Sequence, residues 1–265
     1  MDDKFLEHMD HELAGWTDPA ARLKKALDKD EFVLYCQPIL ALAGEDRYPI
    51  GEVLVRMREE EQALLPPGEF LPVFEHHGMM PQLDRWVVRH VVDRVARGSR
   101  LPRFTINVSG QTLYDAQFPG FVAGTAKAAG VSPASVLFEI DETDILGRLD
   151  AAVRFGAAIK AAGSGVLIDG FGRRSVSFAP LKMLRVDFIK VDGSIVRKII
   201  ANEVARSKMN AVVRVGETLG IGVVAECVEE QDVLARLKAI GVGYAQGFGV
   251  YQPQPIDSIA GATAA

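Results

Sequence analysis

The sequence is poor in cysteine and contains no long apolar run. Its two cysteines, Cys36 and Cys227, lie in short apolar stretches without the spacing of a disulfide framework or a zinc site. We therefore expect both thiols to be free and buried. No apolar segment reaches the roughly 20 residues of a membrane-spanning helix, and the acidic start lacks the apolar centre of a secretory signal. These absences favour a cytoplasmic protein with no membrane insertion of this segment.

Positive charge and histidine are also scarce. Thirty Lys and Arg face 35 Asp and Glu, which gives a formal net charge of −5 with no basic stripe. This balance argues against a DNA or RNA polymer as partner. The histidines lie on predicted helices without carboxylates at zinc-site spacing, so we interpret them as structural or surface residues: His8, His11, His76, His77 and His90. A small phosphate ligand stays possible if metal ions supply the positive charge.

Eight short apolar runs rich in β-forming residues alternate with segments of helical periodicity. The runs cover 32–39, 50–57, 103–109, 135–140, 165–171, 187–192, 222–228 and 244–250. The helical segments cover 69–97, 144–163, 194–220 and 229–240. Alternating strands and helices predict a parallel sheet, and eight such units in a chain of 265 residues predict a closed barrel.

The first connection differs from the others. About ten residues without a helical pattern separate the first two runs, whereas a parallel crossover needs a dozen or more. We therefore predict an α/β fold, a TIM-like (β/α)8 barrel with the first strand antiparallel, over residues 21–256. Residues 1–20 are interpreted as a lead-in helix or linker, and residues 257–265 as a frayed tail.

Polar residues close nearly every predicted strand. They are Gln37, Glu52, Arg56, Asn107, Glu139, Asp169, Lys190, Asp192, Glu226, Glu229 and Gln246. The chemistry of α/β barrels takes place at the carboxyl ends of their strands. Carboxylates gathered there repel one another unless a cation intervenes, and oxygen ligands favour Mg²⁺, Mn²⁺ or Ca²⁺ over zinc. The pattern predicts a divalent-metal site beside a phosphate ligand.

Several short motifs in order resemble those of the EAL domain family, whose members hydrolyse cyclic di-GMP to linear pGpG. The sequence EVLVR at 52–56 resembles the family signature. The other matches are QPI at 37–39, NVS at 107–109, EIDE at 139–142, DGFG at 169–172, KVD at 190–192, ECVE at 226–229 and QG at 246–247. The resemblance extends from about residue 20 to residue 256.

The resemblance implies a role for each matched residue. One Mg²⁺ or Mn²⁺ would be held by Glu52, Asn107, Glu139 and Asp169. Lys190 would help to hold the attacking water, and Glu226 would act as general base or as a contact to a second ion. Cyclic di-GMP would contact Gln37, Leu54, Arg56, Asp84, Asp192, Glu229 and Gln246. Glu142 would anchor the loop that follows Asp169.

Three positions depart from the family pattern. Gly170 stands where the motif DDFG has its second Asp, Asp141 replaces the Thr of ExTE, and RRSVS at 173–177 replaces a Gly/Ser-rich stretch. The family's second metal depends on that Asp, so the second site is expected to be impaired. Loss of a supporting partner alone typically costs 10–100-fold in metal affinity or activity. Arg173 or Arg174 could supply positive charge at a phosphate, but neither can generate hydroxide.

Three functions therefore stay open. The first is a cyclic di-GMP receptor, favoured because binding needs ground-state complementarity whereas turnover needs an activated water. The second is a phosphodiesterase of reduced activity, and the third is a protein-interaction scaffold that binds no nucleotide. We expect Gly170→Asp to raise turnover if the missing carboxylate is the defect.

The segment 194–220 bears on possible protein partners. Its apolar residues fall roughly on one helical face: Ile195, Ile199, Val204, Val212, Val215 and Leu219. Core packing is the favoured use of this face. A homodimer or another protein partner is the alternative.

Overall fold

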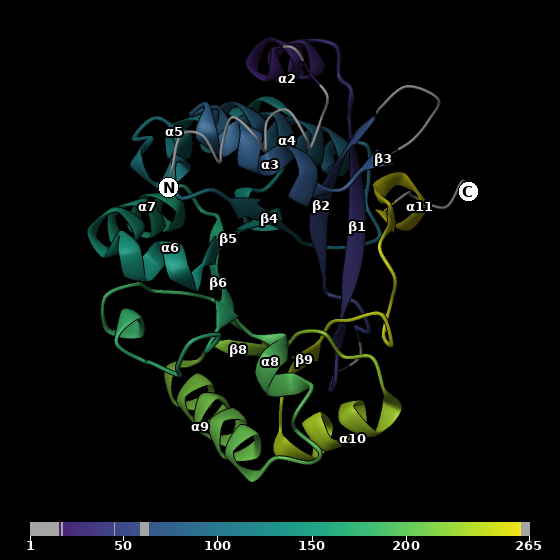
Figure 1. The fold of residues 1–265 in the computed structure, drawn as a ribbon, viewed down its shortest axis with the longest axis vertical. Coiled ribbons are helices and arrows are strands. Elements are labelled where there is room, and N and C mark those ends of the chain that lie inside the picture. Colours follow the sequence, from purple (N-terminus) through teal and green to yellow (C-terminus); the bar gives the residue numbers. More distant parts are fainter. Residues whose placement is uncertain (1–15, 17, 45, 59–63, 261–265) are drawn as a thin grey trace.

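The computed structural model describes residues 16–260 apart from residues 17, 45 and 59–63. A closed barrel of eight strands lies at its centre (Figure 1). In barrel order the strands are β1 (Phe32–Ala41), β2 (Ile50–Arg58), β4 (Phe104–Val108), β5 (Val136–Asp141), β6 (Gly165–Phe171), β7 (Phe188–Val191), β8 (Gly222–Ala225) and β9 (Tyr244–Ala245). Two short strands, β3 (Leu64–Leu65) and β10 (Gln254–Pro255), extend the sheet beside β2 and β1.

The first strand runs against its neighbours, as the sequence predicts. β1 is antiparallel to both β2 and β9, and these two pairings close the barrel. The remaining neighbours around the barrel are parallel. The described residues of the link between β1 and β2, 42–44 and 46–49, contain no helix, and the chain turns back as a hairpin.

Helices surround the barrel. The α-helices are α2 (Pro19–Asp28), α3 (Pro67–His76), α4 (Met80–Ala96), α5 (Phe118–Ala128), α6 (Glu142–Gly147), α7 (Leu149–Ala161), α8 (Gly193–Val196), α9 (Glu203–Leu219), α10 (Gln231–Ile240) and α11 (Ile256–Ala260). Short 3-10 turns are η2 (Thr112–Tyr114), η3 (Pro133–Ser135) and η4 (Pro180–Lys182). Among the described residues, no helix combines the length and apolar character needed to span a bilayer.

The barrel interior has two layers, because inward side chains on one strand recur every second residue. The lower layer, here called the apolar floor, consists of Ile39, Ile50, Leu137, Leu167, Phe188 and Val224. Beneath it, the Arg103 guanidinium lies 5.3 Å from the centre of the Phe188 ring. A larger apolar core fills the space between the barrel and the helices.

Several details correct the sequence predictions. Cys36 is buried, but Cys227 is exposed and has a φ of +54°, because it lies in a turn beyond β8 rather than in a strand. The segment 194–220 forms two helices, and Val204 and Leu219 on α9 are 63% and 53% exposed. Residues 257–260 of the predicted frayed tail belong to α11, whose Ala260 is buried. The predicted lead-in up to residue 15, with His8 and His11, and residues 261–265 lie outside the described residues.

Candidate functional site

The polar residues of the site lie one strand step above the apolar floor. Two positions from a floor residue, on the same face of each strand, are Gln37, Glu52, Glu139, Asp169, Lys190 and Glu226. Asn107 and Gln246 follow Thr105 and Tyr244 by the same step. Period-two alternation thus brings these residues from all eight strands together at one end of the barrel.

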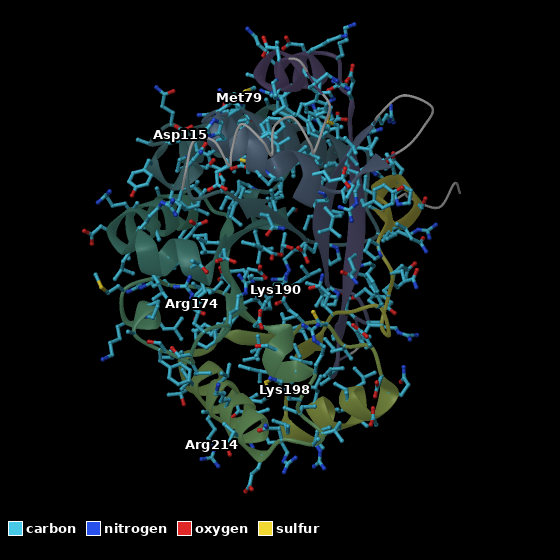
Figure 2. The ribbon with its side chains drawn as sticks, in the orientation of Figure 1. Met79, Asp115, Arg174, Lys190, Lys198 and Arg214 are labelled. Atoms are coloured by element: carbon cyan, nitrogen blue, oxygen red, sulfur yellow. The ribbon has the colours of Figure 1, made fainter. Side chains whose placement is uncertain are left out.

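Lys190 lies at the centre of this layer (Figure 2) and is 1% exposed. Its Nζ is 3.0 Å from Glu52 Oε2, 2.8 Å from Glu139 Oε2, 3.0 Å from Asp169 Oδ1 and 3.0 Å from Glu226 Oε1. One ammonium therefore faces four carboxylates. The ammonium balances only part of their negative charge when all are ionised.

The excess negative charge shifts the protonation of the cluster. Burial raises the pKa of Glu139 to about 8, with a further contribution from Glu52, and burial raises the pKa of Glu226 to about 7. Burial acts in the same direction on Asp169, but Lys190 outweighs it and the pKa of that carboxyl is lowered. Burial opposes the charged form of Lys190, yet its four carboxylates raise the pKa of the ammonium well above its ordinary value. The cluster therefore retains protons near neutral pH.

Amide side chains complete the layer. Gln246 Nε2 donates to Glu52 Oε2 at 2.6 Å and to Gln37 Oε1 at 3.1 Å. Gln37 Nε2 donates in turn to the Tyr251 carbonyl at 2.8 Å, and Asn107 Nδ2 donates to Glu52 Oε1 at 3.0 Å. The bonds from Gln246 and Asn107 orient Glu52 from two sides, and Gln37 in turn holds Gln246.

The donor set fits a divalent cation. Within the described part of the chain, no three His, Cys, Asp or Glu side chains are arranged to hold a metal ion, because the carboxylates converge on Lys190. Glu139 Oε1 is nevertheless buried and has no hydrogen-bond partner among the residues that the structure describes, and the Asn107 amide lies beside Glu52. Hard oxygen ligands with unbalanced negative charge are what Mg²⁺ and Mn²⁺ prefer.

Two pockets flank the hydrogen-bonded pair Glu52 and Asn107. The acidic pocket, about 190 Å³, is lined by Gln37, Glu52, Glu226, Cys227, Glu229, Gln246, Gly247 and Phe248. The apolar pocket, about 320 Å³, is lined by Val53, Leu54, Val55, Pro67, Leu71, Met80, Leu83, Asp84, Val87, Ile106, Asn107, Val108 and Ser109. The site therefore offers two compartments, one lined by Glu52 and the other by Asn107.

Asp84 is the charged group of the apolar pocket. It is 4% exposed, and its Oδ2 accepts from the Ser109 backbone N and Oγ, both at 3.0 Å, and from Thr112 Oγ1. Burial outweighs these hydrogen bonds and raises the pKa of Asp84 to about 6. No hydrogen bond among the described residues involves Oδ1, so this oxygen remains available to a ligand in the pocket.

The structure does not bring Arg56 or Asp192 into either pocket. Arg56 Nη1 donates to the Val55 carbonyl at 2.9 Å, and its guanidinium lies 5.7 Å from the centre of the Tyr35 ring. Asp192 caps α8 by accepting from the Ser194 backbone N at 2.8 Å. A further pocket, about 720 Å³, lies between the start of β1, α4 and α11, away from the carboxylate cluster.

The loop after β6 is tied to α6. Glu142, the first residue of α6, is 4% exposed, and its Oε2 accepts from the Gly172 backbone N at 3.0 Å. Burial raises the pKa of this carboxyl. The contact gives Glu142 the position that a loop anchor requires.

Arg173 fills the space beside Gly170. A Cβ on Gly170 would lie 2.7 Å from Arg173 Cζ and closer still to Nη2. Arg173 Nε donates to Asp192 Oδ2 at 3.0 Å, and Nη1 donates to Asp141 Oδ2 at 2.8 Å. The three departures from the family pattern, Gly170, Asp141 and Arg173, therefore meet in one place.

Sequence reasoning missed several of these features. It assigned Lys190 to a water and did not foresee the four ion pairs of its ammonium. It also omitted Cys227 and Phe248, which line the acidic pocket, although Phe248 follows the QG motif directly. An aromatic residue directly after a polar strand-end motif is the sequence signal that could have found Phe248, which is 66% exposed in the structure.

Comparisons with known proteins agree with this architecture. The EAL domain model matches residues 20–253. The cyclic di-GMP phosphodiesterase PdeF of Escherichia coli K12 is 30% identical over 238 residues, which make up 89% of this chain and 32% of PdeF. An uncharacterized Mycobacterium tuberculosis protein, MT1400, is 33% identical over 244 residues, which make up 89% of this chain and 79% of that protein. The chain spans about a third of the length of relatives such as PdeF.

Solved structures give the same result. The FimX EAL domain from Pseudomonas aeruginosa bound to c-di-GMP has a TM-score of 0.84 at 28% identity, covering 89% of this chain and 96% of FimX's domain. The PaMucR phosphodiesterase in complex with c-di-GMP has a TM-score of 0.82 at 26% identity, covering 91% and 98%. The family model covers most of the chain, and the barrel closes through the reversed first strand that the short first connection predicts. This chain belongs to the EAL domain family.

Proposed function

We propose that this chain is a cyclic di-GMP receptor that binds the dinucleotide over the carboxylate cluster and hydrolyses it weakly or not at all. The observation that carries the proposal is Gly170, which offers no carboxylate and whose missing side chain is replaced in space by the Arg173 guanidinium. A second divalent cation therefore lacks its dedicated ligand. The c-di-GMP complexes of FimX and PaMucR support the choice of ligand.

The two pockets suit a ligand with two bases. Leu54 and its apolar neighbours would cover the face of one purine, while Asp84 would accept from N–H groups on its edge. Glu229, Gln37 and Gln246 give the acidic pocket polar groups for the second half of the ligand. The phosphodiester ring would lie between them, over the Glu52–Asn107 pair. Arg56 and Asp192 would have to contact the ligand outside these pockets.

A single Mg²⁺ or Mn²⁺ would be held by Glu52, Asn107, Glu139 and Asp169. When bound, such an ion supplies positive charge at a phosphate oxygen and acidifies a bound water. Lys190 adds a fixed positive charge next to that place, since its Nζ contacts three of these ligands and Glu226. Glu142 holds the following loop in place through Gly172.

A slow phosphodiesterase is the second candidate, and Glu226 favours it. Burial raises the pKa of Glu226 to about 7, which suits a general base that accepts a proton near neutral pH. Curated relatives such as PdeF are named cyclic di-GMP phosphodiesterases. With one cation in place of two, we expect the rate to fall at least 10–100-fold.

Calorimetry combined with product analysis separates these functions. Cyclic di-GMP is titrated into the protein with Mg²⁺, with Mn²⁺ and with EDTA, and the mixture is then analysed for pGpG by chromatography. Binding without product on the timescale of hours supports the receptor. Rapid product formation refutes it in favour of the enzyme, and no binding heat under any condition refutes both in favour of a scaffold.

The single substitution Gly170→Asp is a poorer test than the sequence suggests. Gly170 has a φ of +64°, which strains residues with a Cβ, and the new side chain would meet Arg173. The double variant Gly170→Asp/Arg173→Ser removes that obstacle. If the missing carboxylate is the defect, pGpG formation rises in the double variant and stays low in Gly170→Asp.

A cyclic di-GMP receptor passes its signal on by contacting another protein. Val204 and Leu219 on α9 are exposed apolar residues available to a protein partner or a second copy of the chain. We place this signalling in the cytoplasm. We expect no DNA or RNA polymer as partner and no membrane insertion of this segment.

A further inference from the structure

Arg173 is held from two sides by aspartates that are themselves fixed. Asp141 caps α6 by accepting from the Thr143 backbone N at 2.7 Å, and Asp192 caps α8 in the same way. β6, which precedes Arg173, pairs with β5 on one side and β7 on the other. The guanidinium therefore bridges the ends of the two strands that flank its own, in an orientation fixed before any ligand binds.

The third nitrogen of the Arg173 guanidinium, Nη2, donates to no acceptor among the described residues. Nε and Nη1 are used by Asp192 and Asp141. Nη2 is also the atom nearest to the place of a Cβ on Gly170. Because the Arg173 side chain is 46% exposed, Nη2 is accessible to a ligand at the carboxyl end of β6.

The charge of Arg173 reaches the cluster. The Arg173 guanidinium packs against Gly170, which directly follows Asp169, one of the four carboxylates around Lys190. The guanidinium therefore brings a fixed positive charge to the edge of the carboxylate cluster. A cation that bridges protein carboxylates and a phosphate is the arrangement that a divalent ion would otherwise provide.

We infer that Arg173 is a ligand-binding residue: a tethered cation that takes the place of a second divalent ion and donates from Nη2 to a phosphodiester oxygen. The inference rests on the proposed dinucleotide ligand. It extends that proposal by assigning the second positive charge to this chain's own side chain. It also implies that the site holds one metal ion, because the guanidinium and a second ion would compete for the same space.

The test compares two adjacent arginines. Arg174 follows Arg173 in the same exposed loop and has no ion pair or hydrogen bond within the described residues, so Arg174→Ala is a matched control for the charge (Figure 2 labels Arg174). Cyclic di-GMP is titrated calorimetrically into wild type, Arg173→Ala, Arg173→Gln and Arg174→Ala at fixed Mg²⁺ and at several NaCl concentrations. We expect Arg173→Ala and Arg173→Gln to weaken binding about 10-fold and to flatten its salt dependence, with Arg174→Ala within about twofold of wild type.

Metal stoichiometry is the second readout. Equilibrium dialysis against Mn²⁺ with saturating cyclic di-GMP should give one ion per chain for wild type and two for Gly170→Asp/Arg173→Ser. A wild type that binds the dinucleotide no more tightly than Arg173→Ala overturns this inference and leaves the receptor proposal standing. A wild type that takes up two ions overturns this inference and also removes the observation that carries the receptor proposal. A wild type that binds no dinucleotide overturns the receptor proposal itself. Melting curves of the ligand-free variants separate a loosened loop, which lowers Tm, from a lost contact, which does not.

Discussion

Replacing Lys190 with Met is the most direct test of the charged layer. The substitution keeps the length of the side chain but removes the ammonium from the centre of four carboxylates. Removing one partner of a buried ion pair typically costs about 3–5 kcal/mol, because the remaining charge stays buried and unpaired. Lys190 is 1% exposed, so solvent screening does not discount this cost. For a domain of this size we expect Tm to fall by roughly 6 °C or more.

The loss should depend on pH. The folded-state pKa values of Glu139 and Glu226 are raised to about 8 and about 7 from 4.5, so the folded state binds more protons than the unfolded state between these limits. Stability from these two groups is therefore fully present below about pH 4.5 and is lost as pH rises through 7 to 8. Without the ammonium both carboxyl groups become harder to ionise, so Lys190→Met should lose more stability at pH 8 than at pH 5.

Divalent cations should rescue the variant. With the ammonium gone, Mg²⁺ or Mn²⁺ no longer competes with it for the carboxylates, and an ion at 100 times its Kd stabilises the folded state by about 2.7 kcal/mol. Thermal unfolding in EDTA and in Mn²⁺, across pH 5 to 8, measures both effects. Lys160→Met is the matched control, since Lys160 pairs with Asp187 near the surface and should change stability by less than about 1 kcal/mol. Equal stability of Lys190→Met and wild type at pH 8 in EDTA would refute the reasoning.

Three further substitutions probe the surroundings of the cluster. Burial raises the pKa of Asp84 from 3.8 to about 6, so wild type loses stability as pH rises through that window, by up to about 3 kcal/mol. Asp84→Asn should flatten this pH dependence, which chemical denaturation at several pH values measures. An unchanged dependence of stability on pH in the variant contradicts the prediction. Glu142→Ala leaves the buried Gly172 N–H without its acceptor and should lower the free energy of unfolding in urea by about 1–3 kcal/mol. Unchanged stability would contradict the role of Glu142 as a loop anchor. Gly249→Ala places a Cβ 2.8 Å from Glu229 Cα and closer still to the Glu229 carbonyl, so it should lower the free energy of unfolding by about 1–3 kcal/mol and weaken ligand binding. The control is Gly124→Ala in α5, where a Cβ meets open space, and this variant should be neutral or stabilising.

The sequence determined the barrel and the composition of its charged layer well. The eight strand-like runs and the short first connection appear in the structure, although β9 is only two residues long. Most of the polar strand-end residues share one layer, whereas Arg56 and Asp192 line neither of its pockets. These features depend on local periodicity, which a single chain displays directly. The roles given to the individual site residues remain predictions until the variants are measured.

The features that sequence reasoning missed depend on contacts between distant segments. The four partners of Lys190 come from four different strands, and the bridge from Arg173 to Asp141 joins residues 32 positions apart. Val204 was assigned to a buried face because the periodicity of 194–220 does not reveal the break between α8 and α9. Cys227 was assigned to a strand because apolar neighbours conceal its turn. Pairings and chain reversals of this kind have no signature in local spacing.

The apolar floor has a kinetic consequence. Its residues are at most 6% exposed, and Phe188 closes the lower end together with Tyr244, 5.4 Å between ring centres. Ions and water therefore reach the carboxylates only from the open end of the barrel, which is also where a dinucleotide would bind. For the proposed ion and dinucleotide, binding is then ordered: the cation would enter first and leave last, and dissociation of the dinucleotide would set the residence time of the ion beneath it.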